Sequence, residues 1–350
     1  MSLTLHVDLP RWREHAAATV EAFPGVVPVI KGNGYGLGTR MLLAECRRLV
    51  DAGSVTAVAV GTYHEAPAAL EALAGLDVEV LVLEPFRRQL HAGLSGHGAP
   101  ALVHTVTDAE DLRALVGLSP QGSGPRILAE GLTTMNRHGA PAGALADLIA
   151  AAPERIGGVT LHLPLGTGHI GEVSTWLDRF PQVRSWFVSH LAATELATLR
   201  AAYPHLTVRP RVGTALWLGA PQALDVRADV LDVRAVAAGE PAGYRGRRMP
   251  AGHLLVVSGG TAHGVALAAP SSVATMRQRV IALAEGVGEA AGRVRSPFVH
   301  AGRHLWFVEP PHMQVSLVHV PSGVAPPSVG DALSARVRLT TTWVDKVATS

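Results

Sequence analysis

The sequence predicts an α/β fold in which a TIM-like (β/α)8 barrel is followed by a mostly-β domain. Strand-like apolar runs alternate with helix-like segments through the first two thirds of the 350 residues. Eight such alternations within about 220 residues fit a closed barrel. After Gly219-Ala220-Pro221 the chain changes to short β runs separated by turns. We therefore expect a barrel over residues 1–221 and a β domain over residues 222–350.

Several of the eight predicted barrel strands are continuously apolar rather than alternating. Strands that are covered on both faces carry such runs, because neither face meets water. A doubly wound open sheet is the alternative arrangement for the same pattern. The predicted strands are Val26–Lys31, Val55–Gly61, Val78–Leu83, Ala101–Val106, Arg126–Glu130, Gly158–Leu163, Trp186–His190 and Thr207–Arg211.

The segments between these strands are rich in Ala, Leu, Glu and Arg, which favour helix. They are Arg40–Leu49, Glu65–Leu73, Ala109–Leu115, Ala142–Ala151 and Ala192–Ala202. In the C-terminal part, Ser272–Glu289 is the one helix-like interruption of the predicted β runs. Those runs are Val233–Ala238, His253–Val257, Leu305–Phe307, Val315–Val320 and Leu333–Leu339.

The composition indicates a globular protein and excludes several classes. Hydrophobic residues make up 48% of the chain, and a net charge of +2 is too small for a nucleic-acid-binding surface. The single cysteine, Cys46, excludes an intrachain disulfide and a multi-cysteine metal cluster. No apolar run approaches the roughly 20 residues that span a bilayer. Residues 1–8 lack the features of a signal peptide, so we expect a cytoplasmic protein without a membrane partner.

Four polar residues lie where a barrel gathers its chemistry, at the carboxyl ends of the strands. Lys31 ends the first predicted strand, and Arg137 follows the fifth. His162 lies at the end of the sixth strand, and Arg211 ends the eighth. The topology alone therefore predicts that these four side chains point into one mouth.

Lys31 is the strongest candidate among them. It ends a buried apolar run and is followed by the glycine-rich segment Gly32–Gly38. A lysine in that place is costly unless it is paired, neutral or covalently used. When its surroundings lower its pKa, such a lysine becomes a nucleophile for Schiff-base formation. The alternative is a surface lysine at a strand end.

The segment from Lys31 to Gly36 resembles the Lys-x-x-x-Tyr-Gly block of alanine racemases and related fold-type III enzymes. The resemblance implies that Lys31 carries pyridoxal 5′-phosphate (PLP) and serves as a base at the substrate Cα. It also implies that Tyr35 donates its hydroxyl to the cofactor phosphate. Packing against the barrel rim is the alternative for Tyr35.

Met135–Gly139 is similar to the Met-x-Arg-x-Gly block of the same family. The resemblance implies that Arg137 contacts the phenolic oxygen of PLP and the substrate carboxylate, for which a guanidinium fork is suited. His162 resembles the family histidine that packs beside the cofactor ring, although a lone strand histidine is as often a core residue. Glu130 falls near an often carbamylated lysine of the family, where a carboxylate could orient the arginine by an ion pair.

Arg211–Gly219 resembles the Arg-x-Gly-x-x-Leu-Tyr-Gly block, with Trp217 in place of the tyrosine. The resemblance implies that Arg211 faces the pyridine nitrogen and that the backbone amides of Gly213 and Thr214 bind the phosphate. A permanent cation at that nitrogen disfavours its protonation. This restrains side reactions and favours racemisation, whereas decarboxylases with the same barrel place a carboxylate there.

Ala242–Gly246 lies where the family has a second Tyr-Gly block, early in the β domain. The resemblance implies that Tyr244 is the second base, supplied across the interface of a homodimer. An ordinary strand tyrosine is the alternative. Met313 aligns with a family methionine whose backbone touches the substrate carboxylate.

His312-x-Gln314 can also be read as a remnant of a metal site found in some related lyases. Because glutamine is a poor ligand for transition metals, we expect no metal here.

The resemblance runs from about Leu5 to about Asp331 and implies a PLP-dependent amino-acid racemase that uses two bases. Two alternatives remain open. One is a PLP-dependent lyase or aldolase acting on a D- or β-hydroxy amino acid. The other is a catalytically silent PLP-binding protein, since the residues expected around the substrate depart more from the family than those around the cofactor.

Overall fold

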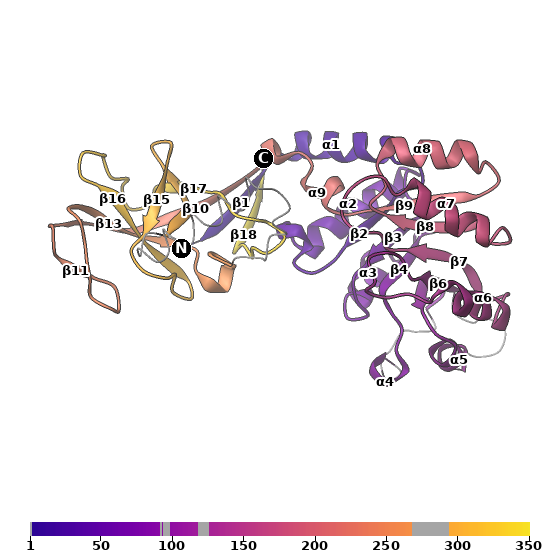
Figure 1. Ribbon diagram of the computed structural model, residues 1–350. Helices are drawn as coiled ribbons and strands as arrows, with labels where there is room; N and C mark the ends of the chain where they lie inside the picture. The colour runs from indigo at the N-terminus through magenta and orange to yellow at the C-terminus, as the bar shows by residue number, and fades with distance from the viewer. Residues whose placement is uncertain (1, 92, 94–98, 118–125, 268–293) are drawn as a thin grey trace. The chain divides into compact units, whose positions relative to one another are not determined.

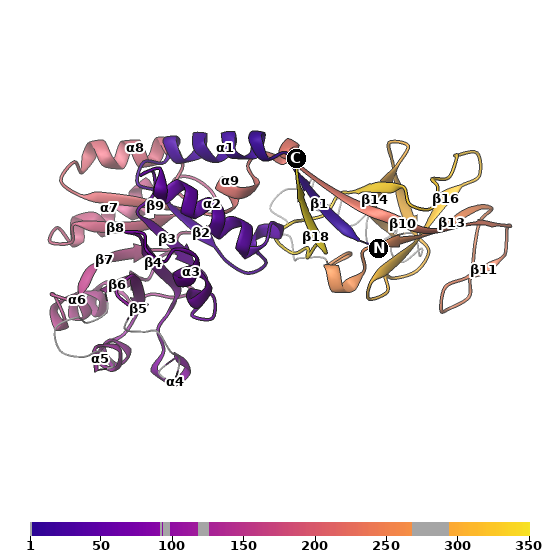
Figure 2. The ribbon, with the colours of Figure 1, turned by 180° about the vertical axis from the view of Figure 1, so that it is seen from behind.

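The computed structural model describes residues 2–91, 93, 99–117, 126–267 and 294–350 (Figures 1 and 2). These residues form two compact units. The barrel unit consists of Arg13–Gly34 and Thr39–Gly219. The sheet unit consists of Tyr35–Gly38, Ala220–Ser350 and the residues up to Trp12. The units therefore do not divide at a single point, and the domain boundary near residue 221 stays a prediction.

Eight parallel strands close the barrel, so the predicted (β/α)8 architecture is confirmed. Closure also excludes the open sheet, because the first barrel strand pairs with the last through Val27–Arg211 and Pro28–Val212. The strands are β2 (Val27–Ile30), β3 (Ala57–Val60), β4 (Glu79–Pro85), β5 (Leu102–Val106), β6 (Arg126–Gly131), β7 (Ile156–Leu161), β8 (Ser185–Ser189) and β9 (Thr207–Val212).

Helices join the barrel strands (Figure 1). Four of the described helices were not predicted, namely α1, α4, α7 and α9, although α7 buries Val173, Trp176 and Leu177 at helical spacing. The helices in the described part are α1 (Leu9–Ala22), α2 (Thr39–Asp51), α3 (Ala66–Ala72), α4 (Arg88–His91), α5 (Ala109–Gly117), α6 (Ala142–Ala151), α7 (Ile170–Arg179), α8 (Ala193–Ala202) and α9 (Thr214–Leu218). None of them has the length and apolar character needed to cross a membrane.

The barrel interior fixes which residues reach the open carboxyl end. Its core contains Val29 of β2, Leu128 of β6 and Phe187 of β8, which pack in one buried cluster. Residues two apart on a strand share a face. Lys31, Glu130 and Ser189 each follow one of these core residues by two positions, so the alternation places them on the inner face, one layer nearer the mouth.

The sheet unit is built on an eight-stranded sheet in the order β13-β16-β15-β14-β17-β10-β1-β18. A two-residue pairing, β11 (Pro241–Ala242) with β12 (Arg247–Arg248), forms a separate hairpin. The predicted helix over Ser272–Glu289 lies outside the described residues. The strands of the main sheet are β1 (Leu3–Val7), β10 (Leu224–Val236), β13 (Gly252–Ser258), β14 (Arg295–His300), β15 (Arg303–Phe307), β16 (Val315–Pro321), β17 (Ala332–Ala335) and β18 (Lys346–Thr349).

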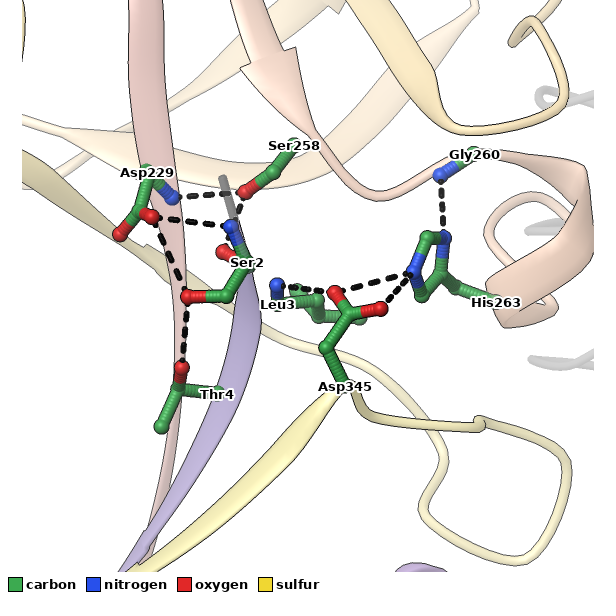
Figure 3. Close-up of polar contacts among 8 residues, drawn as sticks. All are labelled: Ser2, Leu3, Thr4, Asp229, Ser258, Gly260, His263 and Asp345. Carbon is green, nitrogen blue, oxygen red and sulfur yellow. Dashed lines mark hydrogen bonds and ion pairs between the residues drawn. The ribbon is translucent and has the colours of Figure 1, made fainter.

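The N-terminal strand β1 differs from the expectation that residues 1–221 form the barrel domain. It lies between β10, to which it is antiparallel, and β18, to which it is parallel. Figure 3 shows polar contacts that hold its start: Asp345 accepts the N–H of Leu3 at 2.7 Å and lies 3.1 Å from Nε2 of His263. Burial raises the pKa of Asp345, but these two contacts outweigh it and hold the pKa below its usual range.

We predict that Leu128→Ala lowers the free energy of unfolding by about 2–5 kcal/mol, because it leaves a cavity in the barrel core. Leu90→Ala, at an exposed position of α4, is the matched control and should change stability by no more than about 0.5 kcal/mol. Urea unfolding followed by tryptophan fluorescence measures both. Equal midpoints for the two variants would contradict the assignment of Leu128 to the barrel core.

Candidate active site

The structure brings the four predicted mouth residues into one electrostatic environment. Lys31 follows β2, Arg137 lies in the loop after β6, His162 follows β7, and Arg211 lies near the end of β9. Desolvation lowers the pKa of Lys31, and the charges of Arg137 and Arg211 lower it further. Burial lowers the pKa of His162, and the same two arginines lower it further. The mouth therefore holds several cations at close range.

Lys31 is positioned by the loops on either side of it. Gly61 follows β3, and a Cβ at that position would lie 2.8 Å from the Cβ of Lys31. Glu65 accepts the N–H of Gly32 at 2.6 Å through Oε1 and the N–H of Thr62 at 3.0 Å through Oε2. Glu65 also raises the pKa of Lys31, but less than burial and the arginines lower it. The surroundings of Lys31 therefore favour the neutral amine more than water does.

Lys31 is one of only two lysines in the chain, and all the other basic residues counted with them are arginines. The second lysine, Lys346, lies in β18 of the sheet unit and is exposed. A lysine-specific reaction in the barrel can therefore involve only Lys31.

Arg211 is a buried cation with unused hydrogen-bonding capacity. Its side chain is 7% exposed, and its Nη2 donates to the carbonyl of Leu161 at 2.9 Å. Its Nε has no hydrogen-bond partner among the described residues. Burial lowers the pKa of Arg211 to about 10, and Arg137 adds to this while Glu130 opposes it. Arg211 therefore stays positively charged at neutral pH.

Glu130 is the buried carboxylate that faces these cations. It is 3% exposed, and its Oε2 has no hydrogen-bond partner in the described part of the chain. Burial raises the pKa of Glu130, whereas Arg211, Arg137 and Arg87 lower it. The expected ion pair with Arg137 is absent among the described contacts, so Glu130 acts on the arginines through space.

His162 is held in place by Ser189 at the end of β8. Its Nδ1 lies 3.0 Å from the hydroxyl oxygen of Ser189, which also accepts the N–H of Leu163 at 3.0 Å. Burial, with the surrounding cations, lowers the pKa of His162 to about 3. The imidazole is therefore neutral at physiological pH.

His190 is a mouth residue that the sequence analysis did not single out. Its ring lies 5.4 Å from the ring of His162 at 65°, and its backbone is left-handed with φ 57°. Burial and the charges of Arg211 and Lys31 lower its pKa. The rule that barrels gather chemistry at the carboxyl ends of strands would have identified His190, because it directly follows β8.

Three further predicted residues, Tyr35, Gly213 and Thr214, lie on the segments that follow β2 and β9. Tyr35 is buried in a short turn, Gly34–Gly36, with a left-handed φ of 56°. Gly213 caps α9, and Thr214 begins it. Trp217 donates its indole N–H to the carbonyl of Val29 at 2.8 Å. This bond ties α9 to the strand that leads to Lys31.

Tyr244 and Met313 belong to the sheet unit and are 86% and 73% exposed. Near them, Nε2 of His312 lies 2.6 Å from Oε1 of Glu309. No group of three or more His, Cys, Asp or Glu side chains is arranged to hold a metal ion within the described ranges.

The barrel mouth fits an anionic ligand that reacts with an amine. The unpartnered Nε of Arg211 is a buried donor, and an anion would accept from it. Arg137 adds a second guanidinium near a lysine whose pKa is lowered. PLP, which the sequence resemblance implies, has this chemistry: an aldehyde, a phosphate and a phenolic oxygen.

A family model described as the N-terminal domain of alanine racemase matches residues 7–221. The chain matches no curated protein sequence. It is similar in structure to the biosynthetic alanine racemase of Pseudomonas aeruginosa, with 20% identity, a TM-score of 0.67 and coverage of 100% of this chain and 99% of that one. It is also similar to the alanine racemase of Bartonella henselae with covalently bound pyridoxal phosphate, with 19% identity, a TM-score of 0.72 and full coverage of both chains. At such identities, the structural likeness shows a shared fold.

We predict that Lys31 reacts with trinitrobenzenesulfonate at a lower pH than an ordinary lysine does, because its pKa is lowered. Arg137→Gln removes a positive charge near Lys31. It should therefore raise the pKa of Lys31 and move the onset of the reaction to higher pH. Glu65→Gln should move the onset to lower pH. Peptide mass analysis of the cofactor-free protein separates Lys31 from Lys346 across a pH series.

Arg179→Gln, at an exposed position of α7, is the matched control and should leave the onset unchanged. An onset in Arg137→Gln equal to that of the unsubstituted protein would show that Arg137 does not act on Lys31.

Proposed function

Because the chain belongs to the alanine racemase family, we propose that it is a PLP-dependent racemase of an amino acid. The observation that supports this most directly is Lys31, whose pKa is lowered at the end of β2, beside two arginines. A lysine of this kind is suited to bind an aldehyde covalently and later to act as a base.

PLP, when bound, would supply an aldehyde that captures amines and a ring that accepts negative charge from Cα. Lys31 would hold the cofactor covalently. Tyr35 would donate to its phosphate, as would the backbone N–H groups of Gly213 and Thr214 at the start of α9, which have no intrahelical partner.

Arg137 and Arg211 would bind different parts of the cofactor, and Arg137 would also bind the substrate. Arg137 would hold the phenolic oxygen of PLP and the substrate carboxylate, because its guanidinium can donate to two oxygens at once. Arg211 would face the pyridine nitrogen. Since Arg211 keeps its charge at neutral pH, it would keep that nitrogen unprotonated, which favours return of the proton to Cα. His162, as a neutral imidazole, would pack beside the ring without adding charge.

Racemisation requires a proton donor or acceptor on each face of Cα. Lys31 would serve one face, and Tyr244 of a second copy would serve the other. The exposure of Tyr244 and Met313 on the sheet unit supports this, because both side chains are available to another molecule. We therefore propose a head-to-tail homodimer; its cytoplasmic location stays a prediction.

We predict that borohydride reduction of the protein with added PLP labels the peptide that contains Lys31 and not the one that contains Lys346. Lys31→Ala should abolish the label, whereas Lys346→Ala, the matched control, should keep it. Peptide mass analysis gives the result. A label that persists in Lys31→Ala would overturn the assignment of the cofactor lysine.

We also predict that a panel of L-amino acids in deuterated water reveals a substrate by deuterium at Cα and by formation of its D-enantiomer. Tyr244→Phe should lower kcat for racemisation by about 10²–10⁴, the usual contribution of a general acid or base. It should leave the borohydride label on Lys31 intact. Tyr203→Phe, which alters a tyrosine bonded to Asp178 on the barrel unit, is the control. Full racemase activity in Tyr244→Phe would exclude it as the second base.

A further inference from the structure

Tyr244 is exposed to solvent, yet its ring has a stacked neighbour. It lies in the hairpin between β11 and β12, and its ring stacks on that of His312, with centroids 4.4 Å apart and planes at 28°. Aromatic rings in this range attract each other. The stack gives one face of the phenol a fixed neighbour, while 86% of the side chain remains accessible.

Glu309 connects the two stacked residues. This carboxylate is buried, and its Oε2 accepts the backbone N–H of Tyr244 at 2.9 Å. Its Oε1 lies 2.6 Å from Nε2 of His312. One buried group therefore sets both the backbone of Tyr244 and the ring of His312.

Gly243 makes this contact possible. Its φ is +74°, in the left-handed region, and a Cβ at this position would lie 2.5 Å from both carboxylate oxygens of Glu309. Any side chain here would push Glu309 away from the N–H of Tyr244. The residue before Tyr244 thus leaves the space that Glu309 fills.

Backbone hydrogen bonds also hold the main chain of His312, from which its ring extends. Its N–H donates to the carbonyl of Val315 at 2.9 Å, and its carbonyl accepts the N–H of Thr261 at 2.8 Å. The next residue, Met313, accepts the N–H of Ala262 at 2.9 Å. The stack on Tyr244 is therefore held from two separate parts of the sheet unit.

We propose that Glu309 and His312 are positioning residues that hold the phenol of Tyr244 in its working orientation before any second copy or substrate arrives. His312 meets Tyr244 ring against ring, so it sets the direction of the phenol and does not receive its proton. The catalytic meaning of this arrangement rests on the proposed function, but the arrangement itself does not.

The first test needs neither cofactor nor activity. The chain has four tyrosines, so protein labelled with 3-fluorotyrosine should give four ¹⁹F resonances, and Tyr244→Phe identifies the one from Tyr244. His312→Ala should move this resonance toward that of free fluorotyrosine and narrow it. His312→Phe keeps a ring and should move it less. An unchanged resonance in His312→Ala would overturn the proposal.

The second test compares kinetics on the substrate that the amino-acid panel identifies. A misplaced catalytic group costs up to about 10²-fold, so His312→Ala should lower kcat by about 10- to 100-fold with little change in KM. It should slow Cα exchange from the same enantiomer that Tyr244→Phe slows most, and leave the borohydride label on Lys31 unchanged. Glu309→Gln keeps an acceptor for the N–H of Tyr244. Its kcat should therefore lie between that of His312→Ala and that of the unsubstituted protein.

His205→Ala, an exposed histidine of the barrel unit, is the matched control for both tests. A loss of Cα exchange to the same extent from both enantiomers in His312→Ala would contradict a role specific to Tyr244. If the unsubstituted protein racemises no amino acid, the proposed function fails, and the ¹⁹F resonance alone decides whether the stack exists.

Discussion

The crowding of positive charge at the carboxyl end of the barrel governs the chemistry of this protein. Lys31, Arg137 and Arg211 share that space with the buried carboxylate of Glu130. A nearby like charge disfavours the charged form of a group, so it lowers the pKa of a neighbouring cation. The effect matters most for the cation that loses its proton most readily. A guanidinium keeps its proton, and even Arg211, buried as it is, stays charged at neutral pH. Lys31 is therefore the cation whose pKa burial and the two arginines lower.

One type of hydrogen bond recurs in both units: a carboxylate accepts backbone N–H groups and so holds a loop. Glu65 binds the loop after Lys31, and Glu309 binds the hairpin at Tyr244. Glu195 binds the N–H groups of Gly168 and His169, in the loop after β7. Charge-assisted bonds of this kind are stronger than neutral ones. They give loops that carry reactive side chains some of the rigidity that strands have.

The sequence predicted the barrel strands well because they are short apolar runs, whereas closure is established by the pairing of β2 with β9. It also placed Lys31, Arg137, His162 and Arg211 at one end, since parallel strands share their carboxyl ends. It missed the role of Glu309, because this residue lies 65 positions from Tyr244 and only the fold brings them together. It did not predict β1 as a strand, and the pairing of β1 with β10 joins residues more than 200 positions apart.

The place of β1 bears on how the chain matures during synthesis. Its apolar residues Leu3, Leu5 and Val7 are fully buried between β10 and β18. The ribosome makes β1 before the barrel strands, and it makes β10 and β18 after them. The barrel strands can thus pair on the emerging chain while β1 still lacks both of its neighbours in the sheet. For that interval the nascent protein carries an open, apolar strand, and this is the point at which a chaperone would protect it.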